Sequence, residues 1–509
     1  MTWLAVLSGL GHTLLVMTGL LVYVLATRIG QQRRSPSAAL AWVVAMVALP
    51  YVTLPLFLMI GTRKFARPLR PVRKRPAQPA FLVPVALSVP QVSTLLSTPS
   101  TPASTAPTVH TAGPAWATPL LACMQLPPAV RNAAVVWHAD GAMALQGLMR
   151  TIDSATRCLD VCTFVFANDA IGNQVAQALM RAAQRHVAVR LLVDAVGSLH
   201  APGTALQALE RAGVQVQRFM PLFHNPMRGR TNLRNHRKLV VVDQYRLWSG
   251  GRNLAAEYFL DHPGQPAWTD LSYEVCGPLA GQAAAQFAND WVAASGLPKS
   301  AGWSCQALQA HGALPATVTG LPAWEPGGEA IGRWAQWVPS GPDHADDTMH
   351  TLLLAGAYHA QQRMVAVTPY FVPDDALLDA WCLACRRGVQ VTLLLPQRSN
   401  HRLADWARER ALRELAAAGA QIWLAPTMVH AKAVLIDEDF ALSGSLNIDA
   451  RSLFLNYEAM TAFYSPQDLR WLYQWFEKQI AGARPYHASQ PRWARDVAEG
   501  VVRAVGFQL

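Results

Sequence analysis

Two stretches of the chain carry the same reactive side chains at the same spacing. The first, HRKLVVVDQYRLWSGGRN, runs from His236 to Asn253, and the second, HAKAVLIDEDFALSGSLN, runs from His430 to Asn447. Histidine, lysine, aspartate, glycine and asparagine recur at identical offsets in both stretches. An internal repeat of this kind predicts two similar structural units that each contribute part of one site.

The side chains of these repeats suit a small anionic ligand, and a phosphate group fits them best. Histidine and lysine at positions i and i+2 of a strand point to the same face, so an imidazole and an ammonium group can reach one ligand. A glycine pair behind them allows close approach of the backbone, and an asparagine amide follows. Two such strands would surround a phosphate with cationic and neutral donors.

Two imidazoles also suit a displacement in two steps. One attacks phosphorus and forms a phosphohistidine, while the other protonates the leaving alkoxide and later deprotonates an incoming alcohol or water. This chemistry requires no metal, and we expect neither a metal nor another cofactor. A single His-Lys-Asp match would favour an ordinary structural strand, whereas the duplicate at equal offsets favours a functional site.

The elements that must position these residues are strands. LVVV and AVLI, which follow the two lysines, are apolar runs of the buried-strand type, and a polar turn ends each of them. We therefore expect an α/β fold with two repeated domains, residues 132–330 and residues 331–483. Residues 484–509 would form a tail with an amphipathic helix, which either lies on a membrane or packs against the catalytic domain.

The distribution of charge excludes some classes of function. The chain has 509 residues with 43 Lys and Arg against 32 Asp and Glu, a net charge of +11. Ten of the basic residues lie in the first 75 residues, which contain no Asp or Glu, so the rest of the chain is nearly neutral. Affinity for nucleic acid depends largely on positive charge, so this distribution argues against a nucleic-acid partner.

The N-terminal segment predicts a membrane anchor. Residues 2–27 and 35–62 contain no Asp, Glu, Lys or Arg, and roughly 20 apolar residues suffice for a helix to cross a bilayer. Residues 1–62 are therefore predicted to form a two-helix transmembrane hairpin. Pro50 and Pro55 would kink its second helix.

The basic residues around these spans predict their orientation. Seven Lys and Arg lie in residues 63–75, against three in the connection between the spans. The positive-inside rule then places everything after residue 62 in the cytoplasm, and the basic run would attract anionic lipids. Residues 63–131 combine this basic flank with a long Pro-, Ser-, Thr- and Ala-rich stretch, which predicts a disordered linker.

The paired HxKx4D motifs with their trailing Gly and Asn resemble the phospholipase D superfamily. Further stretches resemble the bacterial cardiolipin synthases more narrowly: AWVVAMVALPY in the second predicted span, PSGPD at 339–343, TPYFVPDDALLDA at 368–380 and GSLNIDARSLFLNYE at 444–458. The resemblance covers the hairpin and nearly all of residues 132–480. Residues 298–338 depart from the family pattern and are predicted to be an insertion.

The resemblance implies an α/β sandwich of two similar phospholipase-D-like domains with the active site at their interface. His236 would be the nucleophile, and His430 the general acid and base. Four side chains would hold the phosphate: Lys238, Asn253, Lys432 and Asn447. The motif aspartates, Asp243 and Asp437, complete the catalytic signature, although such aspartates are more often structural.

The resemblance also implies that a carboxylate downstream of each motif orients a catalytic imidazole and favours its charged form. Glu458 matches that position after the second motif, and Asp270 is the better candidate after the first. A lone CxxC formed by Cys382 and Cys385 lies in a predicted helix, and without a second pair it favours helix packing over a metal or redox site.

The implied activity is transfer of a phosphatidyl group between two phosphatidylglycerol molecules, which gives cardiolipin and glycerol. The enzyme would be a multi-pass protein of the bacterial inner membrane with its catalytic part in the cytoplasm. The motifs leave open a phospholipase D or transphosphatidylase that uses water, another alcohol or another phospholipid as the acceptor. A nuclease or a non-catalytic lipid-binding scaffold on the same fold is less favoured.

Overall fold

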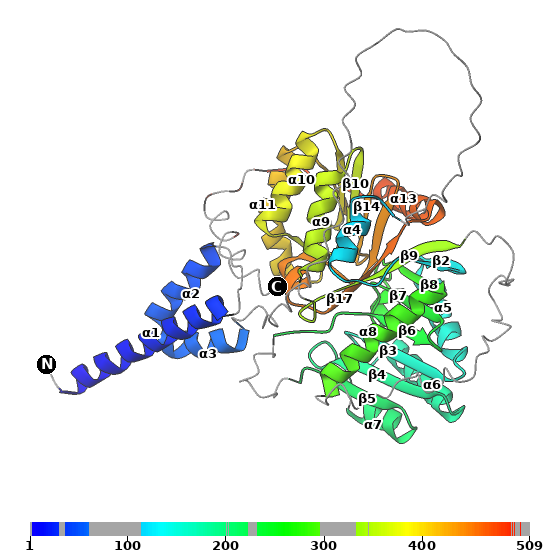
Figure 1. Cartoon of the computed structure of the whole chain (residues 1–509), viewed down its shortest axis with the longest axis horizontal. Helices are drawn as coiled ribbons and strands as arrows, with labels where there is room; N and C mark the ends of the chain where they lie inside the picture. Colours follow the sequence, from blue (N-terminus) through cyan, green and yellow to red (C-terminus); the bar gives the residue numbers. More distant parts are fainter. Residues whose placement is uncertain are drawn as a thin grey trace, which may run out of the picture.

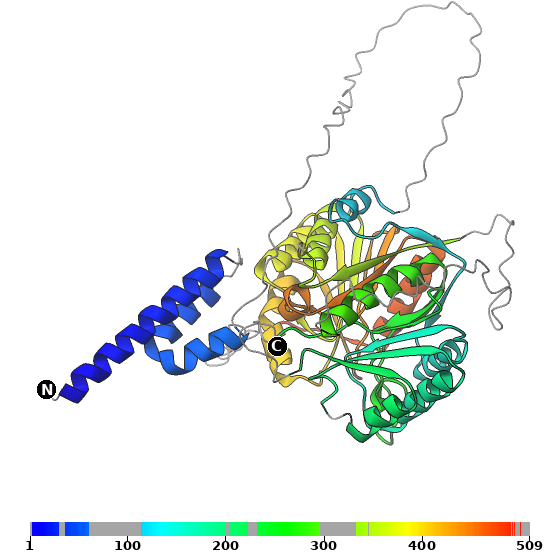
Figure 2. The ribbon, with the colours of Figure 1, turned by 60° about the horizontal axis from the view of Figure 1, so that its bottom comes forward.

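The computed structural model describes residues 3–29, 36–60, 113–199, 201, 203–221, 232–295, 332–344, 346–489, 491, 493 and 499. Figures 1 and 2 show a group of N-terminal helices and a larger body in which two sheets lie side by side with helices around them. Most of the predicted linker, of the predicted insertion and of the C-terminal tail lies outside the described residues.

The first sheet has seven strands in the order β2-β8-β7-β6-β3-β4-β5. Its strands are β2 (Ala134–His138), β3 (Cys158–Thr163), β4 (Ala188–Asp194), β5 (Gln215–Phe219), β6 (Leu239–Val242), β7 (Arg246–Gly250) and β8 (Ser272–Cys276). The associated helices are α5 (Gly141–Asp153), α6 (Ala170–Gln184), α7 (Gly203–Arg211), the short 3-10 helix η2 (Ala256–Tyr258) and α8 (Pro278–Ser295). Strands β3, β4 and β5 are parallel, and the other pairings are antiparallel.

The second sheet repeats this topology. Its order is β1-β9-β17-β15-β14-β10-β12-β13-β18, with strands β1 (Val130–Asn132), β9 (Arg333–Ser340), β10 (Arg363–Val367), β12 (Gln390–Pro396), β13 (Gln421–Ala425), β14 (Ala433–Ile436), β15 (Phe440–Gly444), β17 (Glu458–Phe463) and β18 (Arg484–Pro485). The seven inner strands of this sheet, in the order β9-β17-β15-β14-β10-β12-β13, match the seven strands of the first sheet in order and direction. Strands β1 and β18 add one edge strand on each side. The predicted α/β fold with two repeated domains is confirmed.

The remaining elements of this half are mostly helical. The helices are α4 (Ala117–Cys123), α9 (Thr348–His359), α10 (Asp375–Arg386), α11 (Arg402–Ala417), α12 (Ala450–Phe454) and α13 (Pro466–Ala481), and a small separate sheet pairs β11 (Phe371–Val372) with β16 (Ile448–Asp449). Cys382 and Cys385 lie on α10, as predicted, and both are free thiols.

Three cores hold these layers together. One lies between the first sheet and helices α5 to α7, and another lies between the second sheet and helices α4, α9, α10 and α11. The third is shared: side chains of both sheets pack with those of α8 and α13 in a single buried cluster. Because this middle core belongs to both halves, burial of its apolar surface fixes how the two repeats face each other.

Two predicted segments proved too long. The linker was predicted to be disordered as far as residue 131, but residues 117–123 form α4, whose Ala117 and Leu121 are fully buried in the core of the second half. The predicted insertion was expected to extend to residue 338, but β9 pairs with β17 inside the second sheet. Composition failed for the linker, and the departure from the family pattern failed for the insertion, because tertiary burial stabilises short segments that lack strong local signals.

One described part of the tail contacts the second domain. Glu499 is buried and pairs with Arg413 of α11 at 2.7 Å, whereas Trp493 is 81% exposed. The rest of the predicted tail helix lies outside the described residues. The contact of Glu499 agrees with the second of the two alternatives for this segment, namely packing against the catalytic part.

The N-terminal region differs from a simple hairpin. Residues 3–29 form α1 (Trp3–Ile29), but the second predicted span consists of two helices, α2 (Pro36–Ala48) and α3 (Pro50–Ile60). The rings of Trp42 and Phe57 lie 5.2 Å apart, whereas a straight helix would separate them by about 22 Å. The chain therefore folds back at Pro50, which has no N–H to continue the helix and suits the first position of the next one. Among the described residues, no helix has both the length and the hydropathy of a membrane span.

Candidate active site

Both motif histidines lie at the boundary between the two halves. Each of them is flanked by a residue that forms a parallel β-bridge to the opposite half: Asn235 with Tyr457, and Val429 with Thr269. The backbone N–H of His236 donates to the carbonyl of Tyr457 at 2.9 Å, and that of His430 donates to Thr269 at 2.7 Å. The residue after each bridge partner is a carboxylate, so the bridges bring a carboxylate of one half to the histidine of the other.

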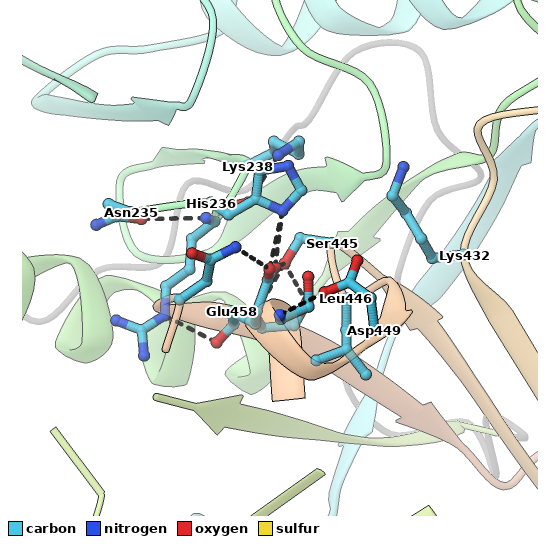
Figure 3. A network of polar contacts seen from close by, with 12 residues as sticks. Asn235, His236, Lys238, Lys432, Ser445, Leu446, Asp449 and Glu458 are labelled. Atoms are coloured by element: carbon cyan, nitrogen blue, oxygen red, sulfur yellow. Dashed lines mark hydrogen bonds and ion pairs between the residues drawn. The ribbon is translucent and has the colours of Figure 1, made fainter. Parts of the chain in front are cut away.

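The first histidine of the site is held by Glu458. Nδ1 of His236 lies 2.9 and 3.0 Å from the two oxygens of Glu458, as the dashed lines in Figure 3 show. Glu458 is fully buried and also accepts hydrogen bonds from Ser445 at 2.5 Å and from Asn456 at 3.3 Å. Because Nδ1 faces a carboxylate, it carries the ring hydrogen, and Nε2 keeps the lone pair that a nucleophile needs.

The second histidine has the matching arrangement. Nδ1 of His430 lies 2.7 Å from Asp270, which is fully buried and accepts a hydrogen bond from the backbone of Leu271. A Cβ atom at Gly251 would lie only 2.2 Å from the carboxylate of Asp270. Position 251 therefore needs glycine, while the equivalent Ser445 of the second repeat reaches Glu458 instead.

Both imidazoles are neutral at neutral pH when the site holds no ligand. Burial lowers the pKa of His236 to about 4, against the opposing effect of the Glu458 carboxylate. Burial and the nearby Lys432 ammonium group lower the pKa of His430 to about 3, against the opposing effect of Asp270. An anionic phosphate between the rings would raise both pKa values, because an opposite charge favours the protonated form.

The carboxylates stay ionised. Burial works to raise the pKa of Glu458, but His236, Lys238 and Ser445 together hold that pKa below its ordinary value. Burial likewise works to raise the pKa of Asp270, while His430 and other nearby cations hold it below its ordinary value. Each imidazole therefore has a fixed negative charge behind it that stabilises a positive charge on the ring.

The two motif lysines share this space. Burial lowers the pKa of Lys238 to about 8 and the pKa of Lys432 to about 7. The charge of Lys238 contributes to the low pKa values of Lys432 and His430, and the charge of Lys432 contributes to that of His236. Nζ of Lys432 lies 2.9 Å from Nε2 of His430, and Nζ of Lys238 donates to the carbonyl of His236 at 2.7 Å. The two imidazoles and the two ammonium groups thus form one buried cluster, which is cationic through the lysines, and Figure 3 shows Lys238 and Lys432 near His236.

The two motif asparagines are buried but differ in their partners. Asn253 accepts from the backbone of Val165 at 3.3 Å and donates to the hydroxyl of Tyr258 at 2.7 Å. In Asn447, Oδ1 is buried without a hydrogen-bond partner among the described residues. The equivalent asparagines are therefore not equally available to a ligand.

The motif aspartates lie away from the site. Asp243 and Asp437 come at the far ends of β6 and β14 from the histidines, after roughly 13 Å of strand. Asp243 accepts from the backbone N–H groups of Thr156, Arg157 and Cys158 at 2.8 to 3.0 Å. Both aspartates were predicted to be part of the catalytic signature, and the structure places each of them apart from the imidazoles, at the other end of a strand.

Asp437 has the same role in the second half. It accepts from the backbone N–H groups of Gln361, Gln362 and Arg363 at 2.8 to 3.0 Å, just before β10. Both aspartates adopt a left-handed conformation, with φ of 50° and 51°. Each aspartate therefore connects the turn after its own strand to the start of a neighbouring strand through hydrogen bonds. This structural role explains why both repeats have an aspartate at this position.

Arg237 is a residue of the site region to which the paired motifs assign no role. It is fully buried and pairs with Asp290, while its other donors reach the carbonyl of Glu458 at 2.9 Å, the carbonyl of Ser340 at 3.0 Å and the carboxylate of Asp343 at 3.2 Å. These partners come from both halves. The available signal in the sequence was an arginine just before an apolar, buried-type strand. Because arginine is rarely buried without a partner, this position indicates an ion pair inside the protein.

Aromatic rings surround the two imidazoles. Phe164 lies edge-on to His236, with the ring centroids 5.0 Å apart. Tyr258 lies edge-on to His430 at 5.0 Å, and Trp268 lies 5.5 Å from the same ring.

No cluster of three or more potential metal ligands occurs among the residues that the structure describes.

Comparisons with known proteins agree with this arrangement. A family model described as cardiolipin synthase, phospholipase-D-like domain, matches residues 148–291 and 353–480, just over half of the chain. Cardiolipin synthase A of Escherichia coli O157:H7 is 33% identical over 326 residues, which cover 62% of this chain and 63% of that protein. Cardiolipin synthase A of Klebsiella pneumoniae subsp. pneumoniae is 34% identical over 325 residues, with 62% of each chain covered.

The chain thus aligns with less than two thirds of the length of these curated relatives. The crystal structure of phosphatidylserine synthase from Haemophilus influenzae is similar to this chain with a TM-score of 0.57 and 14% identity, and the match covers 77% of this chain and 100% of that protein. This similarity shows the fold alone. The family match, the duplicated sheet and the crossed histidine–carboxylate pairs together show that the chain belongs to the family of cardiolipin-synthase-type, phospholipase-D-like domains.

Proposed function

We propose that this protein transfers a phosphatidyl group from one phosphatidylglycerol molecule to another and releases glycerol. The observation that carries the proposal is the pairing of His236 with Glu458 and of His430 with Asp270 around one cationic cluster. A phosphodiester needs a nucleophile on one side, a proton donor on the other and positive charge between them. The curated relatives at 33 and 34% identity bear the name cardiolipin synthase, which supports this choice of substrate.

In the first step, Nε2 of His236 attacks phosphorus and the bond between phosphorus and the glycerol oxygen breaks. His430, whose Nε2 takes up a proton when the anionic phosphodiester enters the site, gives that proton to the oxygen, so that glycerol leaves as a neutral alcohol. The positive charge that develops on His236 lies next to the Glu458 carboxylate. Lys238 and Lys432 stabilise the negative charge on the phosphoryl oxygens.

In the second step, a hydroxyl of a second phosphatidylglycerol molecule gives its proton to Nε2 of His430. Its oxygen attacks phosphorus, the bond between phosphorus and His236 breaks, and cardiolipin forms. The proton that left with glycerol is thereby returned to His430, and each atom of the two substrates appears in a product. Neither step needs a metal or another cofactor.

We further propose that the helices α1 to α3 attach the protein to the bacterial inner membrane as a transmembrane anchor, with the catalytic part on the cytoplasmic side. Leu10, Leu14 and Met17 of α1 are 63 to 70% exposed, which is costly in water and favourable in lipid. The basic residues 63–75 support the cytoplasmic orientation. Retention in membranes after an alkaline carbonate wash would support the anchor, and release by the wash would contradict it.

The activity is tested with membranes that contain the full chain and phosphatidylglycerol labelled in its acyl chains. We expect labelled cardiolipin and one glycerol per cardiolipin without added nucleotide or metal. Phosphatidic acid as the sole product would show that water is the acceptor, and an absence of turnover would contradict phosphatidyl transfer altogether. His236→Asn and His430→Asn serve as controls for background activity of the membranes.

A further inference from the structure

Tyr258 is a buried tyrosine on the wall of the site that the paired motifs do not include. It ends η2 in the first half, and its ring lies edge-on to that of His430 in the second half, with centroids 5.0 Å apart. The ring is 4% exposed and also packs edge-on against Trp268 at 4.8 Å. Its position is therefore fixed beside the imidazole that handles the protons of the proposed reaction.

The hydrogen bonds of Asn253 determine whether the phenol hydroxyl of Tyr258 donates or accepts. The backbone N–H of Val165 can only donate, so the side-chain atom of Asn253 that faces it at 3.3 Å is the amide oxygen. The amide nitrogen is then the atom that faces the hydroxyl of Tyr258 at 2.7 Å. Because an amide nitrogen only donates, the phenol oxygen accepts this hydrogen bond and its own hydrogen points elsewhere.

The hydroxyl hydrogen of Tyr258 has no acceptor among the described residues. A hydrogen-bond donor buried without an acceptor is energetically costly, so such a donor in a functional site indicates a ligand atom. Burial raises the pKa of Tyr258 well above its ordinary value, so the phenol keeps its hydrogen over the physiological range. A hydroxyl that already accepts one hydrogen bond is also a stronger donor in the next.

At the equivalent offset the second repeat has a serine in place of the tyrosine. Ser452 stands five residues after Asn447, as Tyr258 stands five residues after Asn253. In the second half this position therefore has a much shorter side chain, and Asn447 has no phenol partner. The extra donor is thus specific to the first repeat, and it lies on the side of the site that contains His430.

We propose that Tyr258 binds substrate directly, by donating its phenol hydrogen to an oxygen of the phosphate group held between His236 and His430. Asn253 then acts partly through Tyr258, because its amide nitrogen donates to the phenol oxygen and so orients the phenol. This assignment rests on the proposed function only in that the ligand is a phosphate ester. Inorganic phosphate is therefore a sufficient probe.

The test compares Tyr258→Phe with Tyr273→Phe in the full chain in detergent. Tyr273 is a matched control because it is fully buried and its hydroxyl is hydrogen-bonded, at 2.7 Å to Thr461, in the core between the sheets. Affinity for inorganic phosphate is measured by calorimetry, together with kcat and KM for phosphatidylglycerol. Loss of one hydrogen bond, worth about 1 kcal/mol, weakens phosphate binding by about fivefold.

We expect Tyr258→Phe to weaken phosphate binding by about fivefold or more and to lower kcat/KM, with Tyr273→Phe unchanged in both. Equal phosphate affinity of Tyr258→Phe and the unaltered protein would overturn the assignment. If the phenylalanine variant does not fold, 4-aminophenylalanine at position 258 keeps the ring and an N–H donor, and its phosphate affinity must stay within about twofold. A loss of affinity there would equally overturn the assignment.

The same experiment separates this assignment from the proposed function. Phosphate binding that depends on Tyr258 in a protein that makes no cardiolipin would contradict phosphatidyl transfer and leave the role of Tyr258 standing. Cardiolipin synthesis with unchanged kinetics and phosphate affinity in Tyr258→Phe would do the opposite.

Discussion

Nδ1 of His236 lies 2.9 Å from the carboxylate of Glu458, a residue 222 positions further along the chain and in the other repeat. His430 has the reciprocal contact with Asp270, 160 positions before it. Each histidine therefore depends on the opposite half for the group that sets its tautomer. This crossing makes either half alone an incomplete catalyst, although each contains a full motif.

The first prediction concerns these two carboxylates. Glu458→Gln and Asp270→Asn each remove the negative charge behind one imidazole, and we expect each to lower kcat by roughly a hundredfold or more. Glu458→Gln should slow formation of the phosphohistidine, because it acts on the attacking ring. Asp270→Asn should slow proton transfer to glycerol and from the acceptor alcohol. Rapid-quench measurement of the covalent intermediate distinguishes the two.

Glu274→Gln is the matched control for that experiment. Glu274 is also buried and also contacts a histidine, His138, at 2.8 Å, but this pair belongs to the first half alone. We expect this variant to lose stability and to keep its kcat. Similar losses of kcat in all three variants would show that burial of a charged pair, and not its place in the site, explains the effect.

The second prediction concerns the covalent intermediate. With phosphatidylglycerol labelled in its phosphate, protein denatured with detergent at alkaline pH should contain label that is stable to base and labile to acid, as expected of a phosphohistidine. His236→Asn should abolish this label, while His430→Asn should slow both its appearance and its loss. Label that persists in His236→Asn and disappears in His430→Asn would reverse the assignment of the nucleophile.

The third prediction is a loss of activity at high pH. Burial lowers the pKa of Lys432 to about 7 and that of Lys238 to about 8, so both groups lose their charge as the pH rises through these values. We expect kcat/KM, which reports the free enzyme, to fall above about pH 7, because Lys432 is the first of the two lysines to lose its charge. Lys432→Arg, which keeps its charge, should move this limb to higher pH, and an unchanged profile in that variant would argue against the role of Lys432.

The fourth prediction separates the motif aspartates from catalysis. Asp243→Ala leaves the N–H groups of Thr156, Arg157 and Cys158 without their acceptor. We expect a loss of about 1–3 kcal/mol in the free energy of unfolding, whereas kcat per folded molecule should stay within about threefold. Asp437→Ala should behave in the same way. A variant with normal stability and no activity would restore these aspartates to the catalytic set.

The fifth prediction concerns stability in acid. The pKa values of His236 and His430, about 4 and about 3, lie below the value of about 6.5 in an unfolded chain. As the pH falls from about 6.5 to 4, the unfolded chain binds protons that the folded chain does not, so the free energy of unfolding decreases. The lowered pKa values of Glu458 and Asp270 act in the same direction.

Chemical denaturation at pH 7 and at pH 4.5 checks this expectation. The unaltered protein should lose more stability between the two values than a variant with both His236→Asn and His430→Asn. Equal losses would show that the imidazoles are not the groups that take up these protons.

The sequence by itself determined the parts of the site whose chemistry is local. His236 with Lys238, and His430 with Lys432, lie on one face of a strand because side chains alternate along a strand, and this holds before any tertiary contact forms. The repeat of the motif at equal offsets likewise predicted two similar domains, and the seven strands that recur in the same order confirm it.

Only the tertiary structure decided which groups meet. Glu458 reaches His236, and not His430 of its own repeat, because the bridge between Asn235 and Tyr457 joins the halves there. The same contacts place Tyr258 beside His430. These relations depend on how the two sheets pack over their shared apolar core. That packing results from many weak contacts between residues far apart in the sequence, so it cannot be predicted from any local pattern of residues.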